Sequence, residues 1–114
     1  MIKGIGCDIV LLSRVKLELA KRILSEAEVS VLNIQKTLKR QIEFLAGRFA
    51  AKEAIQKALT ALGLTPGLRD ITILPGPSGE PLVIQPEVEG HRILLSIAHE
   101  RSHAIAMCVV ETLS

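Results

Sequence analysis

The chain has 114 residues, of which 48% are hydrophobic and 23% charged, and its formal net charge is +2. This length accommodates one domain, and we expect residues 1–114 to form it. The mild charge, the absence of Trp and Tyr and the presence of two Phe argue against nucleic acid as a partner, since such surfaces need basic patches or aromatic platforms. The high hydrophobic content of so small a chain predicts an oligomer whose subunit interface completes the core.

The sequence also limits the cellular setting. No stretch approaches the roughly 18 consecutive apolar residues of a membrane helix, and segment 1–6 is too short and glycine-broken for a signal peptide. We therefore expect a cytoplasmic protein with no membrane partner. Cys7 and Cys108 each lie in an apolar, strand-like run, which predicts reduced core thiols rather than a disulfide or a metal pair.

In chain order, the first expected element is a strand from Met1 to Val10, because apolar and small residues alternate there. One face of this strand carries two glycines followed by Asp8, which would leave open space leading up to a carboxylate. An amphipathic helix is expected over about residues 13–24. Ser25 and Glu28 then match a capping box, which predicts that another helix begins at this point.

A long helix is expected over about residues 39–62, since Gly63 suits a left-handed C-terminal cap and Pro66 follows it. Residues 70–74 and 82–84 are expected as strands on either side of a turn-rich loop. Residues 92–98 and 103–111 are expected to form a hairpin. Helices first and strands later indicate an α+β fold, in which a mainly antiparallel sheet packs against the long helix.

The long helix carries Glu53 and Lys57 four residues apart. One interpretation is an ion pair on a solvated face, worth about 0.2–0.5 kcal/mol. However, Glu53 falls beside apolar residues such as Ala46 and Phe49 on a helical wheel. Burying an unpaired carboxylate is costly, so the second interpretation is a functional carboxylate that meets a cation, a metal ion or hydrogen-bond donors.

Asp8 is the natural second carboxylate for such a site. Two oxygen ligands with room for water and phosphate are a common way for proteins to hold Mg²⁺. The alternative is that Asp8 only caps the turn after its strand.

Basic residues crowd the long helix, and His99 lies in the predicted hairpin turn. A solvated helix face explains such a run. A phosphate cradle is the alternative, because Arg and Lys suit phosphate oxygens. His99 is likewise either simply exposed or part of a site. The basic residues are Lys39, Arg40, Arg48, Lys52 and Lys57.

Together, these and other segments resemble the holo-[acyl-carrier-protein] synthases, a family of 4'-phosphopantetheinyl transferases. The resemblance follows the whole chain in order. Its most specific part is Arg48-Phe49-Ala50-Ala51-Lys52-Glu53-Ala54 together with Asp8 in the first strand. The other matching pieces are 5–10 with Arg14, 44–47, Lys57-Ala58, Asp70-Ile71, Gly79-Glu80-Pro81 and 95–100.

The resemblance implies an enzyme with the 4'-phosphopantetheinyl transferase-like fold that requires Mg²⁺. Such an enzyme moves 4'-phosphopantetheine from coenzyme A to a serine of the acyl carrier protein and releases adenosine 3',5'-bisphosphate, in support of fatty acid biosynthesis. It also implies a homotrimer with active sites at the subunit interfaces.

Residue by residue, the resemblance makes Asp8 and Glu53 the metal ligands and Lys57 a contact to the coenzyme A phosphates, all three of them catalytic. The base that takes the serine proton is left open between Glu53 and a metal-bound water. Three further residues match positions that bind the nucleotide end with its 3'-phosphate, namely Arg40, Arg48 and His99.

Arg14 matches a contact to the acidic carrier protein, and we expect Lys21 to contribute to the same surface. The chain departs from the family pattern at Glu18, Glu80 and Ala98, where relatives more often carry a basic residue, Lys and Ser. These departures concern substrate contacts more than catalysis. A small basic nucleotide- or RNA-binding module without chemistry is the competing functional class, and it is weakened because a pair of carboxylates would repel phosphate in the absence of a metal ion.

Overall fold

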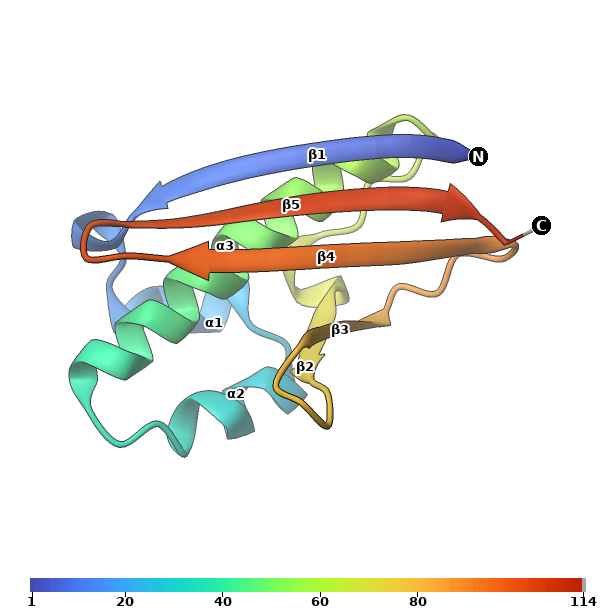
Figure 1. Cartoon of the computed structure of the whole chain (residues 1–114). Coiled ribbons are helices and arrows are strands. Elements are labelled where there is room, and N and C mark those ends of the chain that lie inside the picture. The colour runs from blue at the N-terminus through green and yellow to red at the C-terminus, as the bar shows by residue number, and fades with distance from the viewer. Residues whose placement is uncertain (114) are drawn as a thin grey trace.

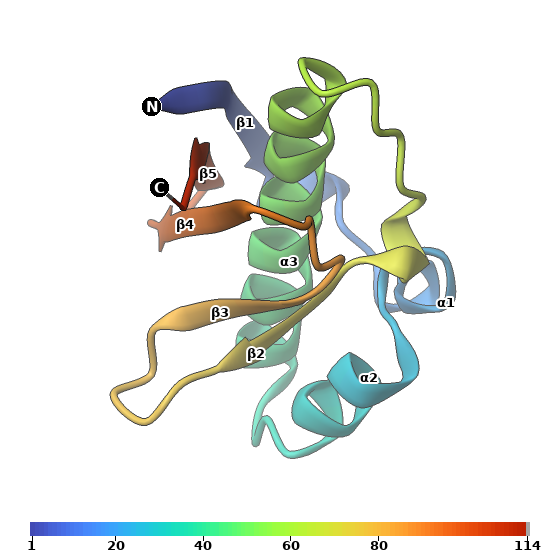
Figure 2. The ribbon, with the colours of Figure 1, turned by 90° about the vertical axis from the view of Figure 1, so that its right-hand side faces the viewer.

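The computed structural model describes residues 1–113 and has the predicted α+β architecture (Figure 1). A three-stranded antiparallel sheet in the order β1-β5-β4 covers one side of the long helix α3. Figure 2 shows α3 between this sheet and the segment that carries α1 and α2. The elements are β1 (Ile2–Leu11), α1 (Ala20–Ile23), α2 (Glu26–Asn33), α3 (Leu38–Thr60), β2 (Thr72–Pro75), β3 (Pro81–Gln85), β4 (His91–His99) and β5 (His103–Thr112).

Helix α3 is capped at both ends, and its C-terminal cap at Gly63 is the one that the sequence predicts. At its N-terminus the Thr37 hydroxyl accepts a hydrogen bond from the Arg40 N–H at 3.1 Å. At its C-terminus Gly63 has a φ of 76°, and the Leu64 N–H donates to the Leu59 carbonyl at 3.1 Å, which closes a left-handed cap. The helix that was expected over about residues 39–62 is thereby confirmed.

Gly4 and Gly6 on β1 allow α3 to lie directly against the sheet. A Cβ atom at Gly6 would lie 2.0 Å from the Ala54 carbonyl oxygen, and one at Gly4 would lie 2.1 Å from the Ala58 carbonyl oxygen. The prediction of open space beside these glycines was therefore wrong, because helix backbone fills it. The close contact brings the middle of α3 next to Asp8, which follows the glycines on the same face of β1.

The prediction of a helix over residues 13–24 is wrong for most of that range. The structure has two 3₁₀ turns, Leu12–Arg14 and Leu17–Leu19, and only the four-residue α1 is helical after them. Between the turns, Val15 and Lys16 have extended backbone, with ψ of 121° and 145°. Val15 is buried in the core, so packing against the core interrupts the helix that the apolar spacing indicated.

The capping box at α2 is confirmed, since the Ser25 N–H donates to Glu28 Oε1 at 2.8 Å. The next expected strand begins later than predicted. Residues Leu68–Asp70 form a 3₁₀ turn that the Asp70 carboxylate caps by accepting from the Gly67 N–H at 3.1 Å, and β2 starts only at Thr72. Strand β3 and the β4–β5 hairpin lie where they were expected.

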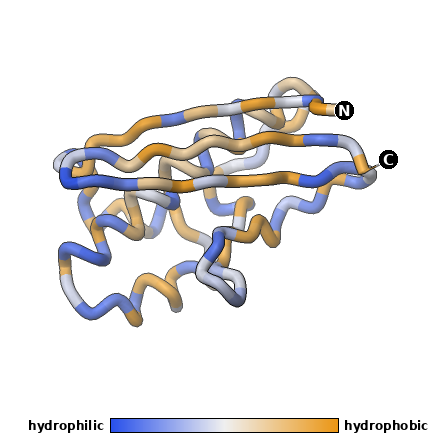
Figure 3. Tube along the Cα trace, in the orientation of Figure 1, coloured by the Kyte–Doolittle hydropathy of each residue, from blue (hydrophilic) through white to orange (hydrophobic). Residues whose placement is uncertain are grey.

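The outer face of the three-stranded sheet, opposite α3, is apolar and exposed. Figure 1 views this face, and the hydropathy colouring in Figure 3 shows apolar segments along its strands. Cys108 points into the core as predicted, but Cys7 lies on the outer face opposite Met107 and is exposed, so its assignment to the core was wrong. The large exposed apolar residues of this face are Ile5, Ile9, Leu94, Ile105 and Met107.

No helix in residues 1–113 is both long and apolar enough to cross a membrane.

Candidate active site

Asp8, Glu53 and Lys57 meet where β1 contacts α3. Lys57 Nζ lies 3.1 Å from Asp8 Oδ1 and donates to the Cys7 carbonyl at 3.0 Å. Lys57 therefore pairs across the helix–sheet contact. Partial burial, followed by the negative charge of Asp8, raises the pKa of Glu53, and the charge of Lys57 opposes this shift. A carboxylate pair that resists holding two negative charges favours a bound cation.

The donor set of Asp8 and Glu53 fits a magnesium ion. Mg²⁺ is held in many proteins by one or two carboxylates and keeps waters and phosphate oxygens in its remaining positions. Within residues 1–113 no cluster brings together three or more His, Cys, Asp or Glu side chains that could hold a metal. Two protein carboxylates thus leave most coordination positions to a phosphate substrate and solvent.

The carboxylate pair opens into a hollow of about 390 Å³, which we call the acidic hollow. Arg14, the predicted contact to the carrier protein, is one of its lining residues. The rest of the lining is mainly apolar, and it includes Val10, Val15, Leu19 and Phe49. The hollow therefore combines a few charged groups with a mainly apolar lining, which suits a partly apolar substrate segment.

A second hollow of about 250 Å³ lies against the N-terminal half of α3, and we call it the basic hollow. Three of its lining residues are the predicted nucleotide contacts, and they come from α3 and the end of β4. The others include the carboxylate of Glu43, the ring of Phe44, and Gly79 and Pro81 from the β2–β3 connection. The three predicted residues that the structure brings together here are Arg40, Arg48 and His99.

Arg48 is the buried cation of the basic hollow, with an exposed fraction of 9%. Its Nε donates to the Ile73 carbonyl at 3.2 Å, and its guanidinium carbon lies 4.5 Å from the centre of the Phe44 ring. Burial lowers the pKa of Arg48, and the charge of Glu28 opposes this effect. No carboxylate in the described part of the chain forms an ion pair with Arg48, so its charge is available to an anion in the hollow.

Comparisons with known proteins show the family of the chain. Residues 4–108 match the family model of the 4'-phosphopantetheinyl transferase superfamily. The chain belongs to this superfamily. It is 44% identical to a holo-[acyl-carrier-protein] synthase of Geobacillus sp. (strain WCH70), with 100% of both chains covered. It is also 44% identical to the synthase of Enterococcus faecalis, with 98% of this chain and 99% of the relative covered.

Solved structures give the same result. The structure of a holo-(acyl-carrier-protein) synthase from Bacillus anthracis in complex with CoA (3',5'-ADP) matches with a TM-score of 0.84 and 38% identity, and 98% of each chain is covered. The synthase of Thermotoga maritima matches with a TM-score of 0.85 and 34% identity over 98% of this chain and 65% of that one. The superfamily and fold implied by the resemblance are therefore confirmed.

Not every predicted residue joins one of the two hollows. Lys21 lies on α1 and lines a different hollow from Arg14, together with Leu24 and Arg69. Lys52 was grouped with the basic residues of a phosphate cradle or a solvated face, and both interpretations are wrong. Its side chain has no exposed surface and forms an ion pair with Glu28.

Two acidic residues of this region were missed. Glu28 was recognised only as half of a capping box, although its carboxylate also pairs with Lys52. Glu43 lies in the basic hollow with one oxygen 3.8 Å from His99 Nδ1. A sequence signal existed for Glu43 alone, since it follows the candidate Arg40 by three residues on the same helix, a spacing that places two side chains on one face.

The departure at Glu80 has a local explanation. Its carboxylate accepts a hydrogen bond from the Ser78 N–H at 2.8 Å, within the turn that joins β2 and β3. The negative charge is therefore held by the turn itself. Ala98 lies on the exposed outer face of β4, opposite Ile105.

Proposed function

We propose that this protein transfers 4'-phosphopantetheine from coenzyme A to a serine of an acyl carrier protein and releases adenosine 3',5'-bisphosphate. The observation that carries the proposal is the pair of hollows along one helix. One is lined by two carboxylates, with Lys57 paired to Asp8 beside them, and suits a metal-bound pyrophosphate. The other is lined by three cationic or titratable groups that suit a phosphorylated nucleotide. Coenzyme A contains both chemical groups.

Each residue has a separate role in this reaction. Asp8 and Glu53 would hold Mg²⁺, which when bound neutralises phosphate charge and orients the pyrophosphate. Lys57 supplies a cation where negative charge develops on the departing phosphate. The serine proton passes either to the Glu53 carboxylate or to a water molecule.

Mass spectrometry provides the direct test. We expect apo acyl carrier protein incubated with the protein, coenzyme A and Mg²⁺ to gain the mass of one phosphopantetheine on a serine. The Glu53→Ala variant should lose this activity by at least about 100-fold, which is the scale of losing a catalytic acid–base group. Its circular dichroism spectrum should remain that of the folded protein. No mass gain with the wild-type protein would refute the proposed function, and full activity of the variant would refute the site.

The acidic carrier protein is proposed to dock beside Arg14. Arg14 is exposed, lies at the end of the first 3₁₀ turn and lines the acidic hollow, so a carrier bound there would place its serine near Asp8 and Glu53. Opposite charges speed association and make it sensitive to salt.

We therefore expect Arg14→Glu to raise the KM for carrier protein about tenfold or more and to leave coenzyme A affinity unchanged. Lys21→Glu is the matched control, because Lys21 is also exposed but lines a different hollow. Steady-state kinetics at two salt concentrations would measure both. An equal effect of the two variants would remove the special role of Arg14 and favour a diffuse basic surface.

The active form is proposed to be a homotrimer with active sites at its subunit interfaces. Arg40 and Lys57 lie 17 residues apart on α3, which corresponds to about 25 Å at a rise of about 1.5 Å per residue. Two chains that contribute opposite ends of α3 to one site would bring a basic hollow and a carboxylate pair closer together. The exposed apolar face of the sheet supplies a surface for such contacts.

A further inference from the structure

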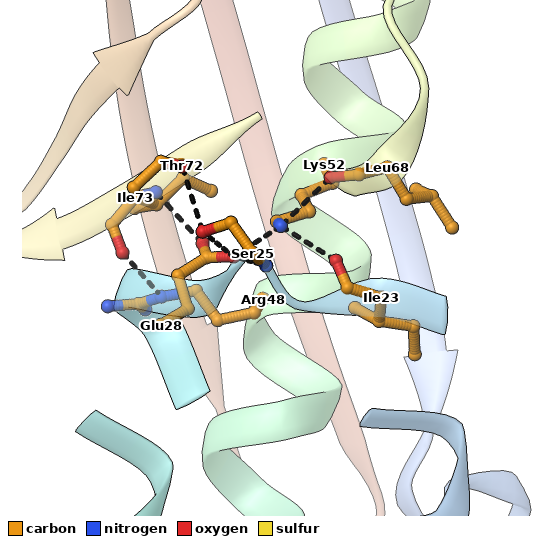
Figure 4. A network of polar contacts seen from close by, with 8 residues as sticks. All are labelled: Ile23, Ser25, Glu28, Arg48, Lys52, Leu68, Thr72 and Ile73. Carbon is orange, nitrogen blue, oxygen red and sulfur yellow. Dashed lines mark hydrogen bonds and ion pairs between the residues drawn. The ribbon is translucent and has the colours of Figure 1, made fainter. Parts of the chain in front are cut away.

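A buried polar network joins α2, α3 and the start of β2 (Figure 4). Its centre is the carboxylate of Glu28, which has no exposed surface. Glu28 Oε1 accepts hydrogen bonds from the Ser25 N–H at 2.8 Å and from the Lys52 ammonium, and Oε2 accepts from the Ile73 N–H at 2.8 Å. One carboxylate therefore connects three segments that are distant in the sequence.

Lys52 completes the network from the side of α3. Besides its bond to Glu28, its Nζ donates to the Ile23 carbonyl at 2.7 Å and to the Leu68 carbonyl at 2.9 Å. An ammonium group has three N–H donors, so all of them are used within the protein. Lys52 is consequently not available to a ligand, although it directly precedes Glu53 in the sequence.

The Ile73 peptide links this network to the basic hollow. Its N–H is held by Glu28 Oε2, and its carbonyl accepts from Arg48 Nε at 3.2 Å. Figure 4 shows Ile73 joined to both side chains by hydrogen bonds. Ile73 also belongs to β2, which pairs with β3 and so leads into the turn whose Gly79 lines the basic hollow.

The charges of the network are unbalanced. Among the described residues, the buried charged side chains are Glu28, Arg48 and Lys52, which amount to one anion and two cations. Lys52 forms an ion pair with the Glu28 carboxylate, so these two charges balance each other. The excess positive charge therefore belongs to Arg48, which is held by its Nε and lines the basic hollow.

We propose that Glu28 is a positioning residue for the basic hollow. Glu28 accepts hydrogen bonds from Lys52 and from the Ile73 N–H, and it thereby fixes the position of Ile73. The carbonyl of Ile73 orients Arg48, and Arg48 then presents its charge to a phosphate group of coenzyme A. This inference rests on the proposed function, which supplies coenzyme A as the anion. Glu28 itself lines neither hollow, so it acts only through Arg48.

The test uses Glu28→Gln, since Gln keeps the shape but has one acceptor oxygen in place of two and cannot serve both Lys52 and the Ile73 N–H. We expect calorimetry on the folded variant to show at least a tenfold weaker affinity for coenzyme A. The KM for carrier protein should change by less than twofold. Val110→Ala, a core change on β5 that lines neither hollow, is the control for lost stability and should leave coenzyme A affinity unchanged.

A double-mutant comparison separates positioning from general loosening of the fold. If Glu28 acts through Arg48, the double variant Glu28→Gln with Arg48→Gln should bind coenzyme A with the same affinity, within twofold, as the single variant Arg48→Gln. A further tenfold loss in that background, or unchanged affinity of folded Glu28→Gln, would overturn the inference. Failure of the wild-type protein to bind coenzyme A would instead overturn the proposed function, and the positioning role with it.

Removing one partner of a buried ion pair can prevent folding, so a second variant replaces both partners. Glu28→Met with Lys52→Met removes the buried charges together while filling similar space. The Ile73 N–H still loses its acceptor, so the same tenfold loss of coenzyme A affinity is expected. Wild-type affinity in this double variant would contradict a positioning role for Glu28.

Discussion

Lys57 pairs with Asp8 across the contact between α3 and β1, not with Glu53 one turn away on its own helix. Spacing of four residues made the helical pair the simpler interpretation of the sequence. The glycines of β1 bring Asp8 close to α3. Lys57 can therefore contact the Asp8 carboxylate and the Cys7 carbonyl together, which favours pairing with the strand over pairing with Glu53. Glu53 is then left beside a second carboxylate.

This placement predicts that Glu53 lowers stability at neutral pH. Its pKa is raised in the folded state, mainly by burial and then by Asp8, so folding is penalised once the pH exceeds the ordinary carboxyl pKa of about 4.3. Glu53→Gln should therefore raise the Tm at pH 7 in metal-free buffer, by about 2–4 °C. The difference should disappear as the pH falls below about 4, where the wild-type group is protonated in both states. Thermal unfolding measured by circular dichroism across this range would test the sign.

Magnesium serves as the control for this prediction. A ligand that binds only the folded state raises its stability. Added Mg²⁺ should therefore raise the Tm of the wild-type protein and have less effect on Glu53→Gln. A variant that is less stable than the wild-type protein at pH 7 would mean that burial and Asp8 do not penalise the charged form of Glu53.

Glu28 and Lys52 show what residue-level reasoning could not reach. The capping box of Ser25 and Glu28 depends on residues three apart, so it was predictable from the sequence. The bonds from Glu28 to Lys52 and Ile73 span 24 and 45 residues, and they exist only once α2, α3 and β2 have packed. A buried lysine surrounded by alanines looks the same in sequence as one that faces solvent on a mixed helix.

At the scale of elements, α3 determines the site and was predicted best. Its length and caps follow from local signals, which are strong for a 23-residue helix. The first predicted helix was mostly wrong because burial of Val15 overrides its helical spacing. The glycines of β1 were also misinterpreted, since a missing side chain is equally compatible with open space and with the close approach of another backbone.

The close approach of α3 to β1 can be tested with two equivalent substitutions. Gly6→Ala places a Cβ 2.0 Å from the Ala54 carbonyl oxygen, so backbone must move, and we expect a loss of about 3 kcal/mol of unfolding free energy. Gly47→Ala on α3 meets only the Cγ2 atom of Ile97 at 3.3 Å and gains about 1 kcal/mol of helix propensity. Gly47→Ala should therefore lie within about 1 kcal/mol of the wild-type protein.

Denaturant unfolding would give both free energies, with the m-value as a check on two-state behaviour. Because Gly6 lies two residues before Asp8, the shift forced by Gly6→Ala should also weaken magnesium binding. Equal stability of the two alanine variants would mean that the backbones of α3 and β1 do not approach each other this closely.

At the scale of the whole molecule, the sheet has one face in the core and one apolar face exposed. Register places the apolar side chains of the exposed face in adjacent rows, with Ile9 opposite Ile105 and Cys7 opposite Met107. Monomeric proteins rarely expose a contiguous apolar surface of this kind, which marks an interaction site. The hydrophobic content of the sequence predicts an oligomer, and the alternation of the strands supplies a candidate surface for its interface.

A charge placed on the exposed apolar face tests whether this face forms the proposed subunit interface. Ile105 lies on the central strand β5 with an exposed fraction of 43%, and Glu at this position would bury a charge in any interface formed by the face. Ile105→Glu should therefore reduce the mass seen by multi-angle light scattering from that of an oligomer to that of a monomer of 12.4 kDa, while the monomer keeps its circular dichroism spectrum.

Ile34→Glu is the matched control, because Ile34 is 73% exposed but follows α2, away from the sheet. If sites span two subunits, the monomeric variant should also lose transferase activity in proportion to its lost assembly, whereas the control should keep both. An oligomer that survives Ile105→Glu would place the interface on another surface.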